Sequence, residues 1–242
     1  MRKAILNLWP SVKHPVKGLW ASEINLESTA LPEQILEQTE ILNANGNSDT
    51  YRFLLTGLEL AMAQDTVSVL DGLVHSVKVQ PTTDPDSLVQ GVMLDIVLEH
   101  KSKCVIRQSP GLPSVIVFSF SRKPLNELFK GRIIGIDPSG GGKDLGMKGP
   151  VSLTEKFVTL EIARELRFLL EHSQAKPILT RTDDSYLTDE SRYKLLSDGR
   201  PALAVKIQVA GSQDPLEQTY GLLADKSCPQ SLTLGTHIAK AL

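Results

Sequence analysis

Short runs of apolar and β-branched residues recur through the first half of the chain, and we predict a strand at each of them. These runs are residues 51–55, 66–70, 75–79, 91–98, 104–106 and 114–120. Segments rich in Gly, Pro, Asn, Asp and Ser separate the runs, a punctuation typical of a small sheet or sandwich. Residues 33–42 carry paired apolar residues that predict one short helix. Residues 1–130 are therefore predicted to form a β-rich domain.

The pattern changes near Lys130, where strands begin to alternate with helices. A helix with apolar residues at helical spacing is predicted from about Ser152, and a last helix is predicted around Leu234 and Ile238. Three apolar strands are interleaved with the helical and polar segments: residues 132–136, 177–181 and 202–209. Such alternation is the pattern of an α/β layer, so residues 131–242 are predicted to form a second, α/β domain.

Composition excludes several classes of protein. The 242 residues include 26 Lys and Arg against 28 Asp and Glu, so no excess of basic residues supports nucleic-acid binding. Cys104 and Cys228 are too few for a disulfide framework or a Cys-rich zinc site. No segment reaches the roughly 20 apolar residues of a membrane span. The apolar residues 4–9 fall short of the roughly 7–15 of a signal peptide, so no export signal is visible and the localisation stays unknown.

The Gly-rich loop that follows the strand at 132–136 does not fit a phosphate site. A P-loop needs Gly-Lys followed by Ser or Thr, but Gly142-Lys143 is followed by Asp144. Asp137 stands where the motif needs its first Gly. Two carboxylates at these places would repel phosphate, and no G-x-G-x-x-G opens the following helix. Nucleotide binding is therefore not favoured.

Residues 136–146, which read I-D-P-S-G-G-G-K-D-L-G, resemble instead the opening strand and loop of the zinc-dependent N-acetylmuramoyl-L-alanine amidases. That family typically reads I-D-P-G-H-G-G-x-D-P-G, with a Glu-Lys pair at the start of the next helix. Glu155-Lys156 stands at that place, fifteen residues after Gly140. Further on, the chain is similar to the family's T-R-x-x-D, its downstream Arg and its S-I-H-A-N at residues 180–184, Arg192 and residues 206–210. The resemblance covers roughly residues 131–210.

This resemblance implies an α/β amidase-like domain, a mixed sheet with flanking helices, incomplete here. In the family, zinc is held by the His of the first loop, the helix-start Glu and the His of S-I-H. The matching positions here are Gly140, Glu155 and Gln208, so Glu155 is the one retained ligand. A late-strand Glu that acts as general acid and base in the family has no counterpart before Leu242.

A catalytic zinc site generally takes three protein ligands plus a water. We therefore expect a pseudoenzyme with no catalytic residue and no zinc or other cofactor. The alternative is an active amidase that hydrolyses the N-acetylmuramoyl–L-alanine bond with an unconventional metal site. In that reading Glu155 would bind the metal with an unidentified His, of which His172 and His237 are the candidates.

The retained residues also have structural interpretations. Ser152-Leu153-Thr154-Glu155 matches a capping box, with Ser152 as N-cap and Glu155 reaching back to a backbone N–H. Arg181, Asp184 and Arg192 are expected to form exposed ion pairs that order loops. The histidines show no metal-binding spacing and are expected to be ordinary surface or edge residues: His14, His75, His100, His172 and His237.

The β-rich first half is similar, in position and strand content, to the modules that often precede these amidases. Such modules resemble envelope-targeting domains. The resemblance therefore implies peptidoglycan or another cell-envelope component as a partner. The family acts in the cell envelope or outside the cell.

Overall fold

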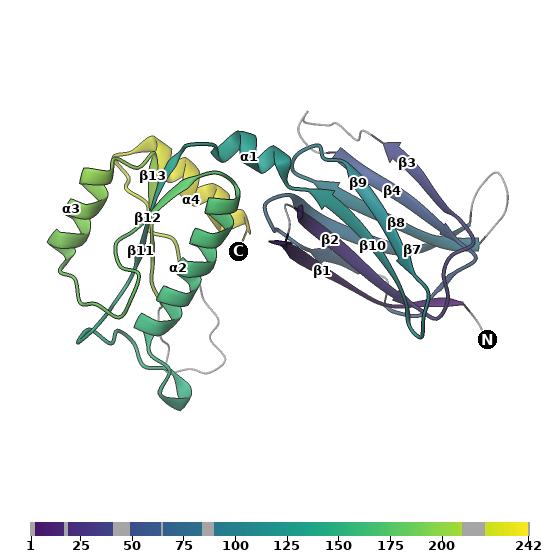
Figure 1. The fold of residues 1–242 in the computed structure, drawn as a ribbon, viewed down its shortest axis with the longest axis horizontal. Helices are drawn as coiled ribbons and strands as arrows, with labels where there is room; N and C mark the ends of the chain where they lie inside the picture. The colour runs from purple at the N-terminus through teal and green to yellow at the C-terminus, as the bar shows by residue number, and fades with distance from the viewer. Residues whose placement is uncertain are drawn as a thin grey trace. The chain divides into compact units, whose positions relative to one another are not determined.

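The computed structural model describes residues 3–16, 19–40, 49–63, 65–83, 90–209 and 221–241. The chain divides into two compact units, Met1–Leu128 and Phe129–Leu242. In Figure 1 the first unit consists of strands followed by the short helix α1 (Lys123–Phe129), and the second combines strands with helices. The division falls next to Lys130, where the sequence pattern changes.

The first unit contains two five-stranded sheets. One has the order β5-β1-β2-β10-β9 and is formed by Glu59–Leu60, Ala4–Val16, Leu19–Ser28, Ser114–Ser121 and Cys104–Ser109, in that order. The other has the order β3-β4-β8-β7-β6 and is formed by Ile35–Glu40, Asp49–Thr56, Gln90–Leu98, Val74–Thr83 and Asp65–Ser68. Neighbouring strands are antiparallel except β1 and β5, which are parallel.

Apolar side chains from both sheets form one core. On β8 the alternate residues Val92, Leu94 and Ile96 are fully buried, as expected for a strand with one face inward. Across the sheets, the rings of Phe53 and Phe118 have centroids 4.6 Å apart. The unit is therefore a β-sandwich, and five of the six predicted runs lie within its strands. The sixth run, residues 66–70, overlaps β6 but extends two residues past its end at Ser68, so the β-rich prediction is confirmed with one boundary wrong.

Two expectations for the first unit were wrong or incomplete. The helix predicted over residues 33–42 is strand β3, which pairs antiparallel with β4 from Ile35 opposite Leu55 to Glu40 opposite Thr50. Pairing with a buried neighbouring strand outweighs a weak helical pattern, and residues 41 and 42 lie outside the described residues. Strands β1 and β2 were not predicted, although Ile24 and Leu26 alternate with polar residues at the period of a strand.

The second unit is an α/β layer, as predicted. Its three described strands, β11 (Ile133–Pro138), β12 (Lys176–Leu179) and β13 (Leu203–Ile207), are all parallel, with β11 in the middle. The mixed sheet that was expected is thus not found among the described strands. Its described helices and 3-10 turn are η1 (Pro150–Ser152), α2 (Glu155–His172), α3 (Asp189–Gly199) and α4 (Pro229–Ala241), while helix α1 (Lys123–Phe129) ends the first unit.

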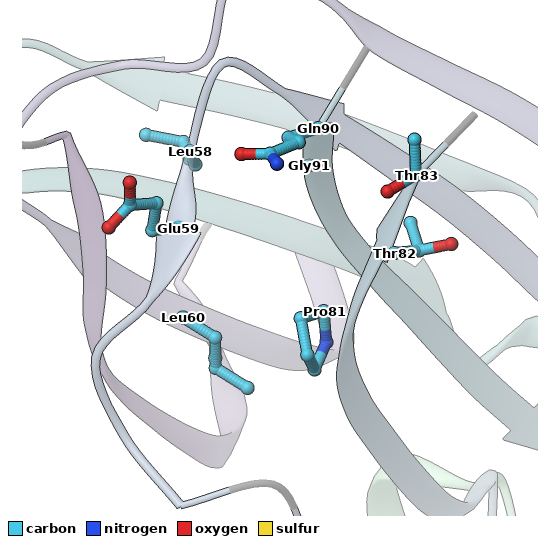
Figure 2. A pocket seen from close by; sticks show the side chains of 8 residues that line it. All are labelled: Leu58, Glu59, Leu60, Pro81, Thr82, Thr83, Gln90 and Gly91. Carbon is cyan, nitrogen blue, oxygen red and sulfur yellow. The ribbon is translucent and has the colours of Figure 1, made fainter. Parts of the chain in front are cut away.

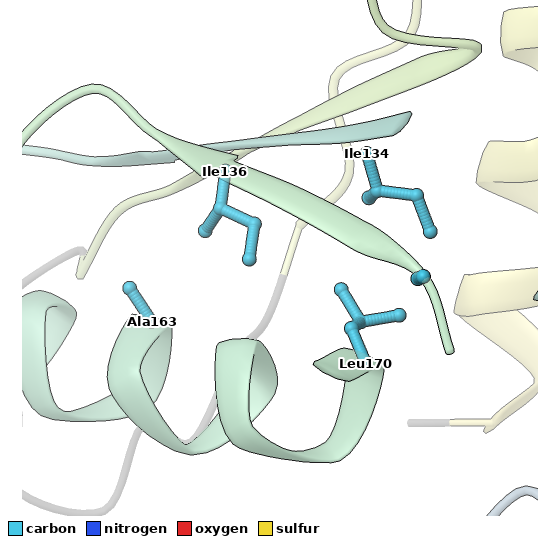
Figure 3. Packing of buried hydrophobic residues seen from close by; sticks show 5 residues of the cluster. Ile134, Ile136, Ala163 and Leu170 are labelled. Carbon is cyan, nitrogen blue, oxygen red and sulfur yellow. The ribbon is translucent and has the colours of Figure 1, made fainter. Parts of the chain in front are cut away.

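Helix α2 packs on this sheet through a small apolar core. Ala163 and Leu170 of α2 face Ile134 and Ile136 of β11 (Figure 3), and Ala175 completes the buried cluster. The packing fixes the first turn of α2 relative to the carboxyl ends of the strands. Among the described helices, none is both long enough and apolar enough to cross a membrane.

Candidate functional site

The positions singled out by the sequence meet at the carboxyl ends of the three parallel strands. The backbone N–H of Ser139, just after β11, donates to the carbonyl of Ile207 at the end of β13 (3.0 Å). The N–H of Thr180, just after β12, donates to the carbonyl of Ile136 (3.0 Å). Carboxyl ends of parallel strands are the usual place for a site in an α/β fold. The first turn of α2 lies beside them.

Glu155 opens α2 and is 8% exposed. Its Oε2 accepts the N–H of Met147 (3.0 Å), and its Oε1 accepts the N–H of Val209 (3.2 Å). The carboxylate therefore connects the Gly-rich loop to the segment after β13. A methyl group on Gly146 would overlap Oε2 of Glu155, so that glycine allows the close approach.

The predicted capping box is wrong. Ser152 lies in the 3-10 turn, and the N-cap of α2 is Thr154. The Thr154 side chain makes no cap hydrogen bond, and its Oγ1 is buried without a partner. The Glu155 carboxylate does not reach back to the cap because it accepts the N–H groups of Met147 and Val209 instead.

The resemblance assigns Gly140 to the loop position of the family's first His. Its φ is +73°, a conformation that favours glycine. A Cβ at this position would lie 2.9 Å from the Cβ of Lys156 and 3.1 Å from the carbonyl oxygen of Asp144. Both contacts are tighter than ordinary van der Waals contact, so the loop as folded has little room for any side chain here. Gln208, at the third family position, follows β13 and is exposed.

Arg181 and Arg192 hold the loop by its carbonyl groups. Arg192 donates to the carboxylate of Asp137 (2.6 Å) and to the carbonyls of Pro138 (2.8 Å) and Gly140 (2.5 Å). Arg181 donates to the carbonyls of Pro138 (3.1 Å) and Ser139 (2.8 Å). Both residues order the loop as predicted, but they are 3% and 5% exposed rather than surface groups. Burial, together with the nearby Arg192, lowers the pKa of Arg181.

Lys156 is a loop-ordering residue to which the sequence interpretation gave no role. It is buried, and its Nζ donates to the carbonyl of Gly142 (2.9 Å) and to Oδ2 of Asp184 (2.7 Å). Asp184 Oδ1 accepts the N–H of Gly142 (2.8 Å). The hydrogen bonds from Lys156 and Gly142 hold the pKa of Asp184 below its ordinary value. In the sequence, the Lys of the Glu-Lys pair was the feature that could have indicated this loop-ordering role.

Asp137 is the second residue whose role was missed. It is 6% exposed, accepts the Thr180 hydroxyl (2.5 Å) and pairs with Arg192. Its position directly after four apolar strand residues indicates burial, and a buried carboxylate requires partners. The sequence could therefore have predicted that Asp137 is paired.

The five histidines lie elsewhere in the fold. His75 Nδ1 lies 2.7 Å from Glu99, and His172 Nδ1 lies 2.7 Å from the carbonyl of Phe168. His172 ends α2, about 25 Å along the helix from Glu155 at a rise of 1.5 Å per residue. His237 is exposed on α4 and His100 follows β8, while His14 belongs to β1 with its side chain outside the described residues.

This donor set does not fit a zinc ion. Of the three family positions, Gly140 has no side chain and Gln208 offers a neutral amide, while both oxygens of Glu155 already accept backbone N–H groups. Within the described residues, no three or more His, Cys, Asp and Glu side chains group closely enough to hold a metal. Tetrahedral zinc sites are built from several His, Cys or carboxylate ligands.

A cavity of about 370 Å³ lies in the β-rich unit (Figure 2). Strand β5 and the facing ends of β7 and β8 line it, through Leu58, Glu59, Leu60, Pro81, Thr82, Thr83, Gln90 and Gly91. All of these residues belong to the first unit, so the cavity is not part of the site around Glu155.

An apolar β11, a Gly-rich loop and a Glu-Lys pair that opens the next helix are the features that resemble the cell-wall amidases. Residues 134–242 match the family model described as N-acetylmuramoyl-L-alanine amidase. Residues 134–242 are therefore similar to the N-acetylmuramoyl-L-alanine amidase family, as the resemblance indicated.

Two curated relatives illustrate the similarity. The chain is 37% identical over 79 residues to a putative N-acetylmuramoyl-L-alanine amidase of Buchnera aphidicola subsp. Schizaphis graminum, which covers 32% of this chain and 34% of the relative. It is 43% identical over 70 residues to the germination-specific N-acetylmuramoyl-L-alanine amidase of Bacillus subtilis, covering 29% of each chain. The match thus spans about a third of these relatives.

A solved structure is also similar. The catalytic domain of CwlV, an N-acetylmuramoyl-L-alanine amidase from Bacillus (Paenibacillus) polymyxa var. colistinus, aligns with 26% identity and a TM-score of 0.34. The alignment covers 36% of this chain and 49% of the CwlV domain.

Proposed function

We propose that the protein is a non-catalytic member of the amidase family that binds peptidoglycan or another envelope component without cleaving it. The observation that carries this proposal is the conformation and crowding of Gly140, which the resemblance places at the first ligand position. Gly140 lacks a side chain and has a positive φ, and a Cβ added to it would lie 2.9 Å from the Cβ of Lys156. A histidine is therefore absent there, and the loop is folded in a way that a histidine would disturb.

The chemistry of the family explains why this position matters. Zinc in a hydrolase lowers the pKa of its bound water from 15.7 to about 7 and polarises the carbonyl under attack. Loss of residues that merely orient the ligands costs about 10–100-fold in metal affinity or activity. Here two of the three ligand positions, Gly140 and Gln208, offer no imidazole. Glu155 alone does not supply the coordination that the reaction requires.

The remaining features of the site support a folded binding unit. Arg181, Arg192 and Lys156 are buried and bonded to loop carbonyls, so protein side chains hold the conformation of the Gly-rich loop. A buried ion pair such as Asp137–Arg192 is costly to break, because the remaining charge would be left unpaired. These contacts favour a role in which the folded domain binds a partner and does not hydrolyse it.

A cleavage assay on muropeptides tests the proposal. The purified full chain, with zinc added, is expected to release no more product than the same protein with a chelator. Product that depends on zinc and disappears in the Glu155→Gln variant would establish the active amidase with an unconventional metal site. Retention on purified sacculi tests the binding part separately, and full recovery in the unbound fraction would contradict it.

A further inference from the structure

The segment between the Gly-rich loop and α2 folds back on itself as a narrow excursion. Lys148 and Thr154 form an antiparallel β-bridge, and the N–H of Gly149 donates to the carbonyl of Leu153 (2.7 Å). Turn η1 closes the excursion and has Val151 at its centre. In Figure 1 this turn lies beyond the lower end of α2, away from the sheet of the second unit. The excursion is therefore a convex projection, and residues 147–153 are called here the Val151 tip.

The Val151 tip exposes apolar side chains. Val151 is 98% exposed, and Met147 and Leu153 on the two arms of the tip are half-exposed. Phe157, in the first turn of α2, is also half-exposed. Exposed apolar side chains that lie together on a protein surface mark an interaction site, whereas scattered ones need no explanation.

The backbone of the tip is strained. Val151 and Ser152 are successive non-glycine residues with positive φ values, +52° and +63°. A β-branched residue is a genuine outlier in this left-handed region, because its Cβ crowds the following carbonyl oxygen. Strained residues of this kind gather at ligand-binding sites and switch regions. The strain is a second observation, independent of the exposure, that marks the tip as a functional segment.

Basic side chains lie behind the apolar tip. Lys148 is exposed at the β-bridge where the tip begins. Lys143 is exposed further back, with its Nζ 4.4 Å from the centroid of the Tyr186 ring. Asp144 is the one acidic residue of residues 143–153, and its carboxylate accepts the N–H of Gly146 (3.1 Å). From the tip inwards, the chain thus presents apolar groups first and ammonium groups behind them.

We propose that the Val151 tip inserts into the surface of an anionic lipid bilayer, so that the protein lies on a membrane without crossing it. A bilayer surface deforms around a convex apolar projection, whereas a partner protein would need a cavity of matching shape. Apolar side chains enter the boundary between headgroups and acyl chains, and the lysines behind them meet the anionic headgroups. This inference goes beyond the proposed function and does not depend on it.

Cosedimentation of the full chain with lipid vesicles tests the inference. The wild type is expected to bind vesicles of phosphatidylcholine mixed with phosphatidylglycerol, and to bind pure phosphatidylcholine at least about fivefold more weakly. Val151→Asn is expected to bind the mixed vesicles at least about tenfold more weakly, because it removes the apolar side chain. Asn tolerates the left-handed region, so this variant is expected to fold. Leu112, 88% exposed in the first unit, supplies the control, and Leu112→Asn is expected to bind as the wild type does.

A charge reversal tests the role of the lysines. Lys148→Glu is expected to bind the mixed vesicles at least about fivefold more weakly than the wild type. Lys101→Glu makes the same change in net charge at an exposed position of the first unit, and it is expected to leave binding unchanged. Equal weakening in the two variants would mean that net charge alone drives binding, which would overturn the tip as the contact.

Tryptophan emission reports insertion of the tip itself. Leu153→Trp places an indole on one arm of the tip, and its emission is expected to shift to shorter wavelength when mixed vesicles are added. Leu112→Trp places an indole on the first unit and is expected to show no shift. A shift in Leu112→Trp without one in Leu153→Trp would place the lipid contact elsewhere and overturn the inference.

Retention on purified sacculi, which are free of lipid, separates this inference from the proposed function. Absence of vesicle binding by the wild type, or equal vesicle binding by Val151→Asn, overturns the Val151 tip as a membrane contact, whatever the sacculi retain. Vesicle binding without retention on sacculi keeps the tip and removes peptidoglycan from the proposed function. Loss of retention on sacculi in Val151→Asn would make peptidoglycan the occupant of the tip and overturn the bilayer. Circular dichroism and thermal unfolding of each variant show whether it is folded, and the wild-type comparison of the two vesicle types tests the inference even where a variant is not.

Discussion

At the residue scale, backbone conformation constrains the Gly-rich loop as much as side-chain contacts do. Gly140 and Gly131 both have positive φ values, +73° and +71°. They differ in their surroundings, because a Cβ on Gly131 would meet nothing within 4 Å, whereas one on Gly140 would meet Lys156 and Asp144. A side chain at Gly131 would therefore cost only the free energy of the left-handed backbone conformation. A side chain at Gly140 would add steric overlap to that cost.

We predict that Gly131→Ala destabilises the protein by about 1–2 kcal/mol, the cost of a side chain in the left-handed region. Gly140→Ala adds steric overlap, which costs about a further 1–3 kcal/mol. Urea unfolding of the two variants measures the difference. Equal destabilisation would mean that the loop yields to a side chain, which would weaken the structural argument for the loss of the first ligand.

The Asp184 contacts predict a dependence on pH. Lys156 and the N–H of Gly142 lower the pKa of Asp184 below its ordinary 3.8. A carboxyl whose pKa is lower in the folded state stabilises the fold above the ordinary value, and this contribution is lost as the pH falls through the folded pKa. Stability followed from pH 6 to pH 2 is therefore expected to fall less steeply in Asp184→Asn. An unchanged slope would show that the loop does not depend on this carboxylate.

At the element scale, two helices of the second unit begin at a threonine, but only one threonine caps its helix. Thr188 accepts the N–H of Ser191 (3.2 Å) at the start of α3. Thr154 precedes α2 and makes no side-chain cap bond, and its buried hydroxyl lacks a partner. The backbone N–H groups of Glu155 and Lys156 instead donate to the carbonyls of Met147 and Leu145, at 2.8 Å and 3.4 Å.

Substitution of these threonines is expected to have opposite consequences. Thr188→Ala removes a cap and should cost about 1 kcal/mol of stability. Thr154→Val keeps the shape and removes an unpaired buried hydroxyl, so it should be neutral or stabilise the protein by about 1 kcal/mol or less. Thermal unfolding of both variants checks this. A clear loss of stability in Thr154→Val would indicate that the Thr154 hydroxyl is bonded in solution.

Strands and helices with strong local patterns were predictable from the sequence, whereas those that depend on pairing were not. Residues 91–98 and 114–120 alternate or run apolar and form β8 and β10. Strand β3 was predicted as a helix because its apolar residues come in pairs, and only its pairing with β4 makes it a strand. Side-chain partners across the fold, such as Arg192 with Asp137, are separated by 55 residues and leave little local signal.

At the scale of the whole molecule, a β-sandwich and an α/β unit that matches the amidase family model occur in one chain. The three positions that the resemblance assigns to zinc ligands can be named from motif spacing alone, and their assignment stays a prediction. The use of Glu155 to bond Met147 and Val209 was not predictable, because it depends on the path of the loop back over α2. We therefore propose that the α/β unit is a folded, metal-free scaffold.

Zinc content of the purified full chain, measured after incubation with zinc and removal of the unbound metal, tests this central claim most directly. We predict far less than one zinc per chain, with the same value in Glu155→Gln. One zinc per chain that is lost in Glu155→Gln would show that other donors converge on this carboxylate, and it would contradict the claim of a metal-free unit.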